Sequence, residues 1–353
     1  MHRAFKMNRR QPLLLLLILS ACIDRIDIGK SEADGMQIVV DGFISNEPKF
    51  HRVKLFRSSG TYDILSNPEP FSAKEVSISD DLGNREILRE FGLGNYFTNG
   101  TYRGEVGRTY ILRIEARDGR IYESSPETIQ PSGTIDTVYY EFESFKPLSG
   151  PTESGFRIYM DSRGANQEEN FLRWRFTGTY KITAFPELNT IGPATAPIPA
   201  PLSCCSSCWV VQAEDKPKVS KGQFLSDGVF RKVEVGYVPI TERSFQVKYM
   251  IEVEQMSLSR DAYNFWKTVQ DQREGVGSLF QPPLGIPRTN IFGTRGEDNV
   301  QGIFYASSVA RKIVFLTRED VRQFMSVPVA QQHTGSCLDF DGAQVFQPQF
   351  WVD

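Results

Sequence analysis

The sequence predicts a mainly β protein, with an N-terminal immunoglobulin-like β-sandwich followed by a larger β-rich domain that carries one or two packed helices. Short segments of alternating apolar and polar residues recur between turns rich in Gly and Pro, of which the chain has 28 and 20. Phe and Tyr are abundant, and only two stretches have helical spacing. No repeat of about 20–50 residues is visible, which excludes solenoids and propellers.

The first 21 residues have the layout of a secretory signal peptide. Four basic residues precede an apolar run at 13–19, and Leu19-Ser20-Ala21-Cys22 follows. The run is too short to cross a bilayer, which needs roughly 20 apolar residues. The tetrad resembles the bacterial lipobox, so we expect Cys22 to carry the lipid anchor; an ordinary signal peptide before a cysteine is the alternative. The sequence leaves open whether Met1 or Met7 is the start.

Acyl chains on Cys22, palmitate among them, would tether the mature domain to a membrane. Each buried methylene contributes about 0.8 kcal/mol, and two or three chains make attachment effectively permanent. Residues 22–35 are polar and are expected to form the lipidated tether. Asp24 and Asp27 follow the cysteine closely, as in lipoproteins that reach the cell surface in the Bacteroidota. We therefore expect an outer-membrane location, at the cell surface or on the periplasmic face.

The charge of the mature chain argues against a nucleic-acid partner. Four of the 40 Lys and Arg residues lie in residues 1–21 and none of the 43 Asp and Glu residues does, which leaves a formal charge of −7. A mildly acidic, well-mixed surface lacks the basic stripe of a nucleic-acid binder. It also gives no electrostatic reason to lie on anionic lipid.

Residues 36–130 are expected to form the immunoglobulin-like β-sandwich domain. About seven short strands in about 95 residues fit that fold. Asp118-Gly119 predicts a tight hairpin turn, since Gly supplies the positive φ that such a turn requires. The expected strands include 36–45, 53–57, 75–79, 109–116 and 121–124.

Residues 131–353 are expected to form the β-rich C-terminal domain. It begins with strands at 135–142, 156–161 and 171–182. Five prolines at 186–201 give a composition that cannot form an ordered core. The clearest alternation is at Phe245–Val253, which predicts a strand with one face in the core and the other in water.

Two helices are expected in the C-terminal domain. Ala262, Phe265, Trp266 and Val269 recur at helical spacing after Ser259, a candidate N-cap. We interpret this stripe as a helix packed on a sheet rather than as a ligand-stacking surface. A shorter helix is expected to begin at Thr317, with Asp320 completing a capping box.

The segment Glu254–Trp266 resembles the Q-x-S-L-S-x-x-A-Y-x-F-W stretch of a Bacteroidota outer-membrane lipoprotein family catalogued as domain of unknown function 4249. Gln281 and Ile303 depart from the family pattern, where Asp and Tyr or Leu are expected, and the adjacent Cys204-Cys205 is unusual. Further matching segments are Gly277–Pro283, Asn290-Ile291, Gly302–Ser307, Cys208-Trp209 and Pro348–Trp351.

The resemblance implies a non-catalytic accessory of a TonB-dependent receptor, a β-barrel of the outer membrane, in nutrient capture or envelope assembly. It supplies no catalytic residues. The alternative is an independent glycan- or peptide-binding module at the surface, which exposed aromatic side chains would favour.

Four cysteines besides Cys22 are available for disulfides, because an exported protein passes through an oxidising compartment. Cys204, Cys205, Cys208 and Cys337 allow three pairings, and adjacent cysteines rarely bond to each other. We favour Cys208–Cys337, which would contribute about 4–5 kcal/mol by closing a loop of about 130 residues. The alternative is a zinc site made by Cys205, Cys208, His333 and Cys337.

No catalytic motif or cofactor motif is recognisable. His51 and His333 are the only mature histidines, and the chain has no Gly-x-Ser-x-Gly elbow, His-Glu-x-x-His helix or phosphate-binding loop. An enzyme is therefore not expected, and a carboxylate-based hydrolase is the residual alternative. Its candidate acid pairs are Asp80/Asp81, Glu168/Glu169 and Asp339/Asp341.

Overall fold

A computed structural model describes residues 37–58, 68–147, 150–165, 170–213, 216–220, 227–275, 285–296 and 300–352. The expected signal peptide, the expected lipid anchor at Cys22 and the expected tether lie outside these residues, as do Gln281 and the pair Glu168/Glu169. Residues 36–353 form one compact unit, and the description below concerns that unit.

The first β-sandwich is built from two sheets whose strands alternate between core and surface. In β8, Tyr110, Leu112 and Ile114 are buried and the residues between them are half-buried, because successive side chains of a strand point to opposite faces. Its first ten strands are β1 Ile38–Ser45, β2 Arg52–Arg57, β3 Glu69–Pro70, β4 Glu75–Asp80, β5 Arg85–Ile87, β6 Arg89–Glu90, β7 Asn95–Phe97, β8 Thr109–Glu115, β9 Ile121–Ser124 and β10 Glu127–Thr128.

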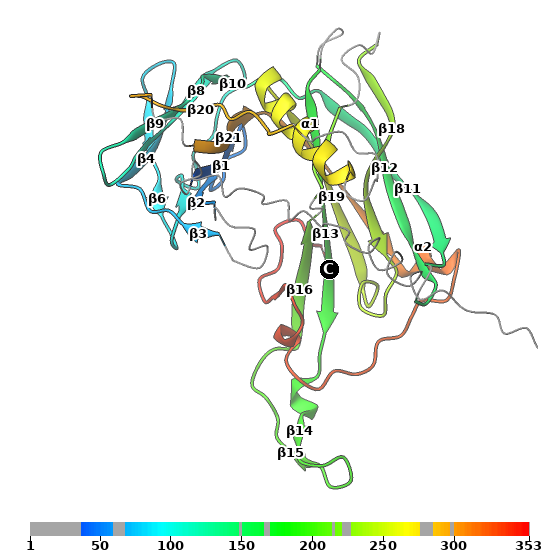
Figure 1. The fold of residues 1–353 in the computed structure, drawn as a ribbon. Helices are drawn as coiled ribbons and strands as arrows, with labels where there is room; N and C mark the ends of the chain where they lie inside the picture. Colours follow the sequence, from blue (N-terminus) through cyan, green and yellow to red (C-terminus); the bar gives the residue numbers. More distant parts are fainter. Residues whose placement is uncertain are drawn as a thin grey trace, which may run out of the picture. The chain divides into compact units, whose positions relative to one another are not determined.

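Two strands from far along the chain complete this sandwich (Figure 1). β21 (Val300–Ser307) pairs with β1 in parallel, and β20 (Ile291–Gly293) pairs with β9 antiparallel. The sheets therefore run in the orders β21-β1-β2-β7-β6 and β20-β9-β8-β4-β5. The sequence placed all residues after 130 in a second domain, since pairing between distant segments leaves no local signal.

A second pair of sheets follows, with a core between them. β11 (Thr134–Phe145), β12 (Glu153–Arg163) and β18 (Val229–Pro239) form one sheet. The other has the order β22-β19-β13-β16-β23, with β17 paired to β13. Phe156 of β12 packs in one cluster with Trp174 of β13 and Tyr249 of β19. The strands of the second sheet are β13 Leu172–Thr183, β16 Ser207–Ala213, β17 Lys218–Val219, β19 Lys248–Ser257, β22 Val309–Thr317 and β23 Ala343–Gln344.

The mainly β fold class is thus confirmed, but the strand expected at Phe245–Val253 is shifted. The observed strand is β19, and Phe245 is buried ahead of it. The face expected in water is covered as well, since Arg311 of β22 lies 3.1 Å from Glu252 and 2.9 Å from Glu254. The alternation of apolar and polar residues identified one buried face of the strand. It could not show that the acidic residues on the other face would pair with an arginine of the neighbouring strand.

Both expected helices are present with their expected N-caps. α1 is Arg260–Gly275, and the Ser259 hydroxyl accepts a hydrogen bond from the Ala262 N–H at 3.1 Å. α2 is Arg318–Arg322, with a capping box between Thr317 and Asp320. α1 packs on strands, as predicted: Ala262 shares a buried cluster with Tyr305 of the first sandwich and with Met256 of β19.

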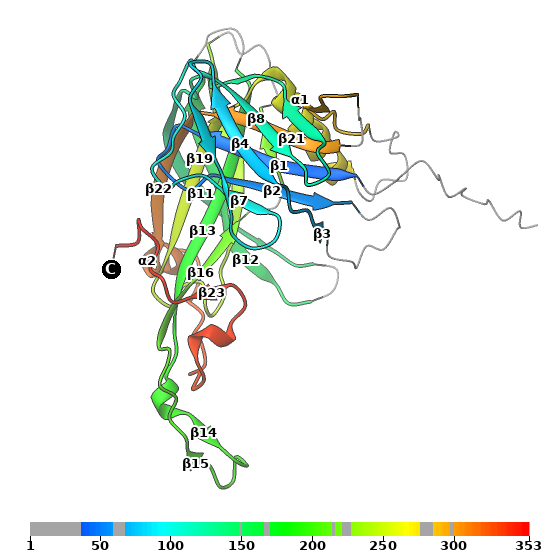
Figure 2. The ribbon, with the colours of Figure 1, turned by 90° about the vertical axis from the view of Figure 1, so that its left-hand side faces the viewer.

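The proline-rich segment forms an arm beyond the ends of β13 and β16 (Figure 2). It consists of a short 3-10 turn, Pro186–Leu188, and a two-stranded hairpin of β14 (Thr190–Ile191) and β15 (Ile198–Pro199). Its side chains Leu188, Ile191 and Ile198 are exposed. The arm has the pairing of a hairpin but no core of its own, as its composition predicts.

Within the described residues, no helix is both long and apolar enough to cross a membrane.

Candidate functional site

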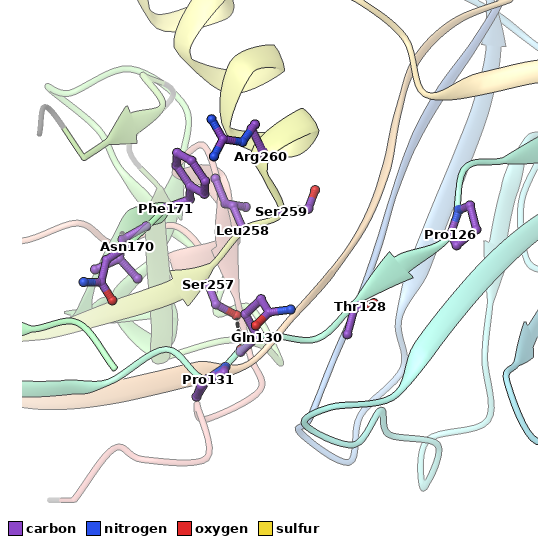
Figure 3. A pocket seen from close by; sticks show the side chains of 11 residues that line it. Pro126, Thr128, Gln130, Pro131, Asn170, Phe171, Ser257, Leu258, Ser259 and Arg260 are labelled. Carbon is purple, nitrogen blue, oxygen red and sulfur yellow. Dashed lines mark hydrogen bonds between the residues drawn. The ribbon is translucent and has the colours of Figure 1, made fainter. Parts of the chain in front are cut away.

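The first candidate site is the junction between the sandwiches, where the segment 126–134, the start of β13 and the end of β19 meet. It encloses a hollow of about 350 Å³. In Figure 3, Phe171, Leu258 and Arg260 come from the side of β13 and α1, whereas Pro126 and Thr128 come from the first sandwich. The segment Glu254–Trp266, singled out by the sequence, forms one wall.

Gln255 has no exposed surface, and its side-chain amide makes several hydrogen bonds at the junction. Its amide nitrogen donates to the carbonyl oxygens of Ser132 at 2.7 Å and Arg163 at 3.0 Å. Its amide oxygen accepts from the Trp174 indole N–H at 2.8 Å. A buried amide with all these bonds made fixes the chain between the sandwiches to β13 and β19.

Ser257 and Leu258 continue the attachment. The Ser257 hydroxyl donates to the Gln130 carbonyl (dashed in Figure 3) and accepts from the Ser308 N–H at 2.9 Å. The Leu258 N–H donates to the Phe171 carbonyl at 2.8 Å. These side chains therefore hold three chain segments together and have little capacity left for a ligand in the hollow.

Asn290 and Glu127 form the polar interior on the side of the first sandwich. The Asn290 side chain donates to Glu127 Oε1 at 3.0 Å and to the Phe304 carbonyl at 2.7 Å, and it accepts from the Phe304 N–H at 3.0 Å. Glu127 is 1 % exposed. Burial raises the pKa of Glu127 to about 7, although the Ser259 and Asn290 side chains favour its charged form.

An arginine connects α1 to both sandwiches. The guanidinium of Arg173 on β13 lies 3.6 Å from the centre of the Trp266 ring, and it donates to the Tyr305 hydroxyl at 2.9 Å. A cation over an indole face is a favourable contact, and more so away from water. Trp266, the last residue of the segment Glu254–Trp266, thus packs against the largely buried guanidinium of Arg173.

Gly302 allows β21 to approach β1. Its φ is +95°, and a Cβ built at this position would lie 1.9 Å from the Val40 carbonyl oxygen. Only a residue without a side chain fits there. The segment Gly302–Ser307 therefore closes the first sandwich, which accounts structurally for another part of the matching sequence.

The second candidate site is a hollow of about 870 Å³ on the first sandwich, which we call the rim hollow. Apolar side chains project into it: Phe91 is 82 % exposed and Phe50 is 70 % exposed. It is lined by Phe50, Arg85, Glu86, Ile87, Arg89, Phe91, Phe97, Thr98 and Asn99.

The walls of the rim hollow are held in place. The Asn99 N–H donates to Glu86 Oε1 at 2.7 Å. Gly100 seats the ring of Phe50, since a Cβ at that position would lie 2.9 Å from the Phe50 Cζ. The sequence analysis missed this site. Its residues carry no local signal, because single apolar residues such as Phe91, in the turn after β6, are common at protein surfaces.

A model of the family described as "Domain of unknown function (DUF4249)" matches residues 23–313. The chain belongs to this family. A comparison with curated proteins finds no match. The DUF4249 match spans the first sandwich and the second sandwich as far as β22, so the junction lies wholly inside it.

In this DUF4249 protein, one Ser–His pair has the spacing of a nucleophile and its base. Ser45 Oγ lies 3.0 Å from His51 Nε2, and Thr98 Oγ1 lies 3.5 Å from Nδ1. Both Ser45 and His51 are buried, and the third partner is a hydroxyl rather than a carboxylate. Burial, assisted by nearby Lys49, lowers the pKa of His51 to about 4. The pair has the environment of a packed core histidine.

The candidate acid pairs bind basic side chains. Asp80 and Asp81 both contact Arg108, the former at 2.9 Å. Asp339 lies 2.8 Å from His333 Nε2. Neither of the two described pairs lines one of the two candidate sites.

The cysteines are joined in two disulfides. Cys208 and Cys337 are linked, with a Cα–Cα distance of 5.7 Å, which is the pairing we favoured. Cys204 and Cys205 are also linked. We expected adjacent cysteines to bond only rarely because the geometry is strained, and this second link differs from that expectation.

The zinc alternative would need the thiolates of Cys205, Cys208 and Cys337, which are all in disulfides here. Of the residues that the structure describes, no group of three or more His, Cys, Asp or Glu side chains is placed to hold a metal ion.

Proposed function

We propose that the mature protein is an outer-membrane lipoprotein, anchored through Cys22, and a non-catalytic accessory of a TonB-dependent receptor in nutrient capture or envelope assembly. The observation that carries the proposal is that the segment Glu254–Trp266, which resembles the family, is used for packing. Gln255, Ser257 and Trp266 are engaged in holding the two sandwiches together. A segment used in this way is suited to a scaffold that presents its outer surfaces to a partner.

The anchor is tested by fractionation and mass spectrometry. Wild-type protein is expected in the membrane fraction with an acylated N-terminal cysteine, whereas Cys22→Ser is expected to leave it. Ser31→Ala, in the same tether, is the control and should behave as wild type. A Cys22→Ser protein that remained in the membrane would contradict the anchor.

The receptor is tested by affinity purification from native membranes in mild detergent. We expect a TonB-dependent β-barrel to be recovered with the protein. Surface labelling of intact cells then separates the cell surface from the periplasmic face. Repeated recovery of the protein alone would count against the accessory role.

A second candidate function, an independent glycan- or peptide-binding surface module, is favoured by the exposed rings of Phe50 and Phe91 in the rim hollow. Aromatic rings left exposed beside polar groups are typical of recognition sites. Glycan and peptide arrays test this function. It is excluded if neither yields a ligand.

A further inference from the structure

The rim hollow lies beside the open edges of both sheets of the first sandwich. β5 is the last strand of one sheet and β6 is the last strand of the other. The segment 85–90 contains both strands, so among the described residues it forms the edge of both sheets beside the rim hollow. Unpaired main-chain groups at a sheet edge are a template for a further strand.

The pairing of β5 shows which main-chain groups are directed outward. The Asp80 N–H donates to the Asn84 carbonyl, and the Leu88 N–H donates to the Val76 carbonyl, both at 2.9 Å. Because main-chain groups alternate in direction along an antiparallel strand, those of residues 84, 86 and 88 face β4. The N–H and C=O of Arg85 and Ile87 therefore point away from the sheet.

The side chains beside this edge have a matching character. Ile87 is exposed, as are Phe50 and Phe91, and all three line the rim hollow. Arg85 and Arg89 flank Ile87 on the same exposed face of the segment. Arg85 is paired with Glu75, so an incoming strand would meet apolar rings at one position and the positive charge of Arg89 beside it.

We propose that the rim hollow binds an extended segment of a partner polypeptide, which adds to β5 as a further strand. An apolar side chain of that segment packs between Phe50 and Phe91, and a carboxylate of the same segment pairs with Arg89. Main-chain bonds to Arg85 and Ile87 supply affinity, and the pocket and the charge supply selectivity. This inference makes the peptide-binding half of the second candidate function specific and rests on it. It does not depend on the receptor.

A phage-displayed library of random decapeptides tests the proposal, with the purified mature chain as bait. We expect selected peptides to share a bulky apolar residue, an acidic residue and the absence of proline at the centre. A synthetic peptide of the selected sequence is then used for affinity measurement and for hydrogen exchange. Its binding should slow amide exchange at residues 85–87, which a contact through side chains alone would not do.

Three variants examine separate parts of the site. Arg89→Glu should weaken the acidic peptide about tenfold, and replacing its acidic residue with Lys should restore affinity. Phe91→Ser should also weaken binding about tenfold. Ile87→Pro removes an outward N–H without removing a bond to β4, so it should abolish the exchange protection while the fold, checked by circular dichroism, persists.

The controls are matched in type, and neither residue lines the rim hollow. Leu93→Ser changes an apolar residue that is 73 % exposed but does not line the rim hollow. Arg295→Glu reverses an exposed charge just after β20, which is the strand at the far end of the sheet that ends in β5. Both should bind the peptide within about twofold of wild type.

The proposal is overturned if the library yields no peptide above background, or if selected peptides bind Arg89→Glu and Phe91→Ser as tightly as the controls. Absence of protection at 85–87, or binders found only on a glycan array, also overturns it. If a receptor is recovered from membranes but the phage library yields no peptide, the accessory role stands and this inference is refuted.

Discussion

The junction and the rim hollow contain similar residue types that are used in opposite ways. At the junction, the amides of Gln255 and Asn290 and the ring of Trp266 are engaged by neighbouring segments. At the rim hollow, Phe91 and Arg89 face solvent beside an open strand edge. Both regions lie inside the family match. The comparison teaches that the segment Glu254–Trp266 is used for the architecture of this protein, whereas the candidate binding groups are side chains that the fold leaves exposed.

The comparison predicts the largest effect for Gly302→Ala. Its Cβ would overlap the Val40 carbonyl at a positive φ, so β21 could not stay paired with β1. We expect a loss of about 4 kcal/mol in the free energy of unfolding, measured by denaturant titration. Gly83→Ala is the control: its φ is +85° but nothing lies within 4 Å of the new Cβ. It should cost only about 1 kcal/mol. Equal losses in the two variants would show that the positive φ, and not the overlap with Val40, determines the loss in the free energy of unfolding.

Gln255→Ala should have the next largest effect. It leaves the Trp174 indole N–H and the Ser132 and Arg163 carbonyls without their buried partner. We expect a loss of about 3 kcal/mol in the free energy of unfolding. Gln331→Ala, at an exposed position, should stay within about 0.5 kcal/mol of wild type. A small loss at Gln255 would mean that the junction is not the main attachment between the sandwiches.

Local pattern predicted the elements well and the contacts between distant elements poorly. The strand at 121–124 and both N-caps were correct because alternation, Ser259 and Thr317 act over a few residues. β20 and β21 were missed because their partners are far away in the chain. The junction motif was located through family resemblance, but its residues could be seen to bind structural partners only once Ser132, Arg163 and Gln130 were placed beside them.

The pH dependence of stability separates two buried groups of the first sandwich. Glu127 has a pKa of about 7 when folded, above its ordinary value of 4.5. The folded state therefore retains a proton that the unfolded chain releases, and stability falls as pH rises from 4.5 to about 7. Glu127→Gln should remove this loss, which is about 3 kcal/mol by linkage, and be more stable than wild type at pH 8. Unfolding titrations at pH 5 and pH 8 measure it.

Titration of His51 changes the stability in the opposite direction, over a pH range that overlaps with that of Glu127. Its folded pKa of about 4 lies below the ordinary 6.5, so the unfolded chain takes up the proton first and stability falls as pH drops from 6.5 to 4. Between pH 4.5 and 6.5 the two groups oppose each other in wild type. His51→Gln should therefore reveal the decline in stability with rising pH, and Glu127→Gln the decline with falling pH, each about 3 kcal/mol in total. Parallel curves for both variants would contradict these assignments.

The smallest effect on stability is expected at the rim hollow. Phe91 is 82 % exposed, so Phe91→Ala removes little buried apolar area and should change the free energy of unfolding by less than about 0.5 kcal/mol. Phe304→Ala, in the fully buried core of the first sandwich, should cost about 3–5 kcal/mol and serves as the control. A small loss would show that the Phe91 ring contributes little to the folded state, which leaves it available to a bound segment. A large loss at Phe91 would instead make the ring part of the core, and the contrast between the rim hollow and the junction would disappear.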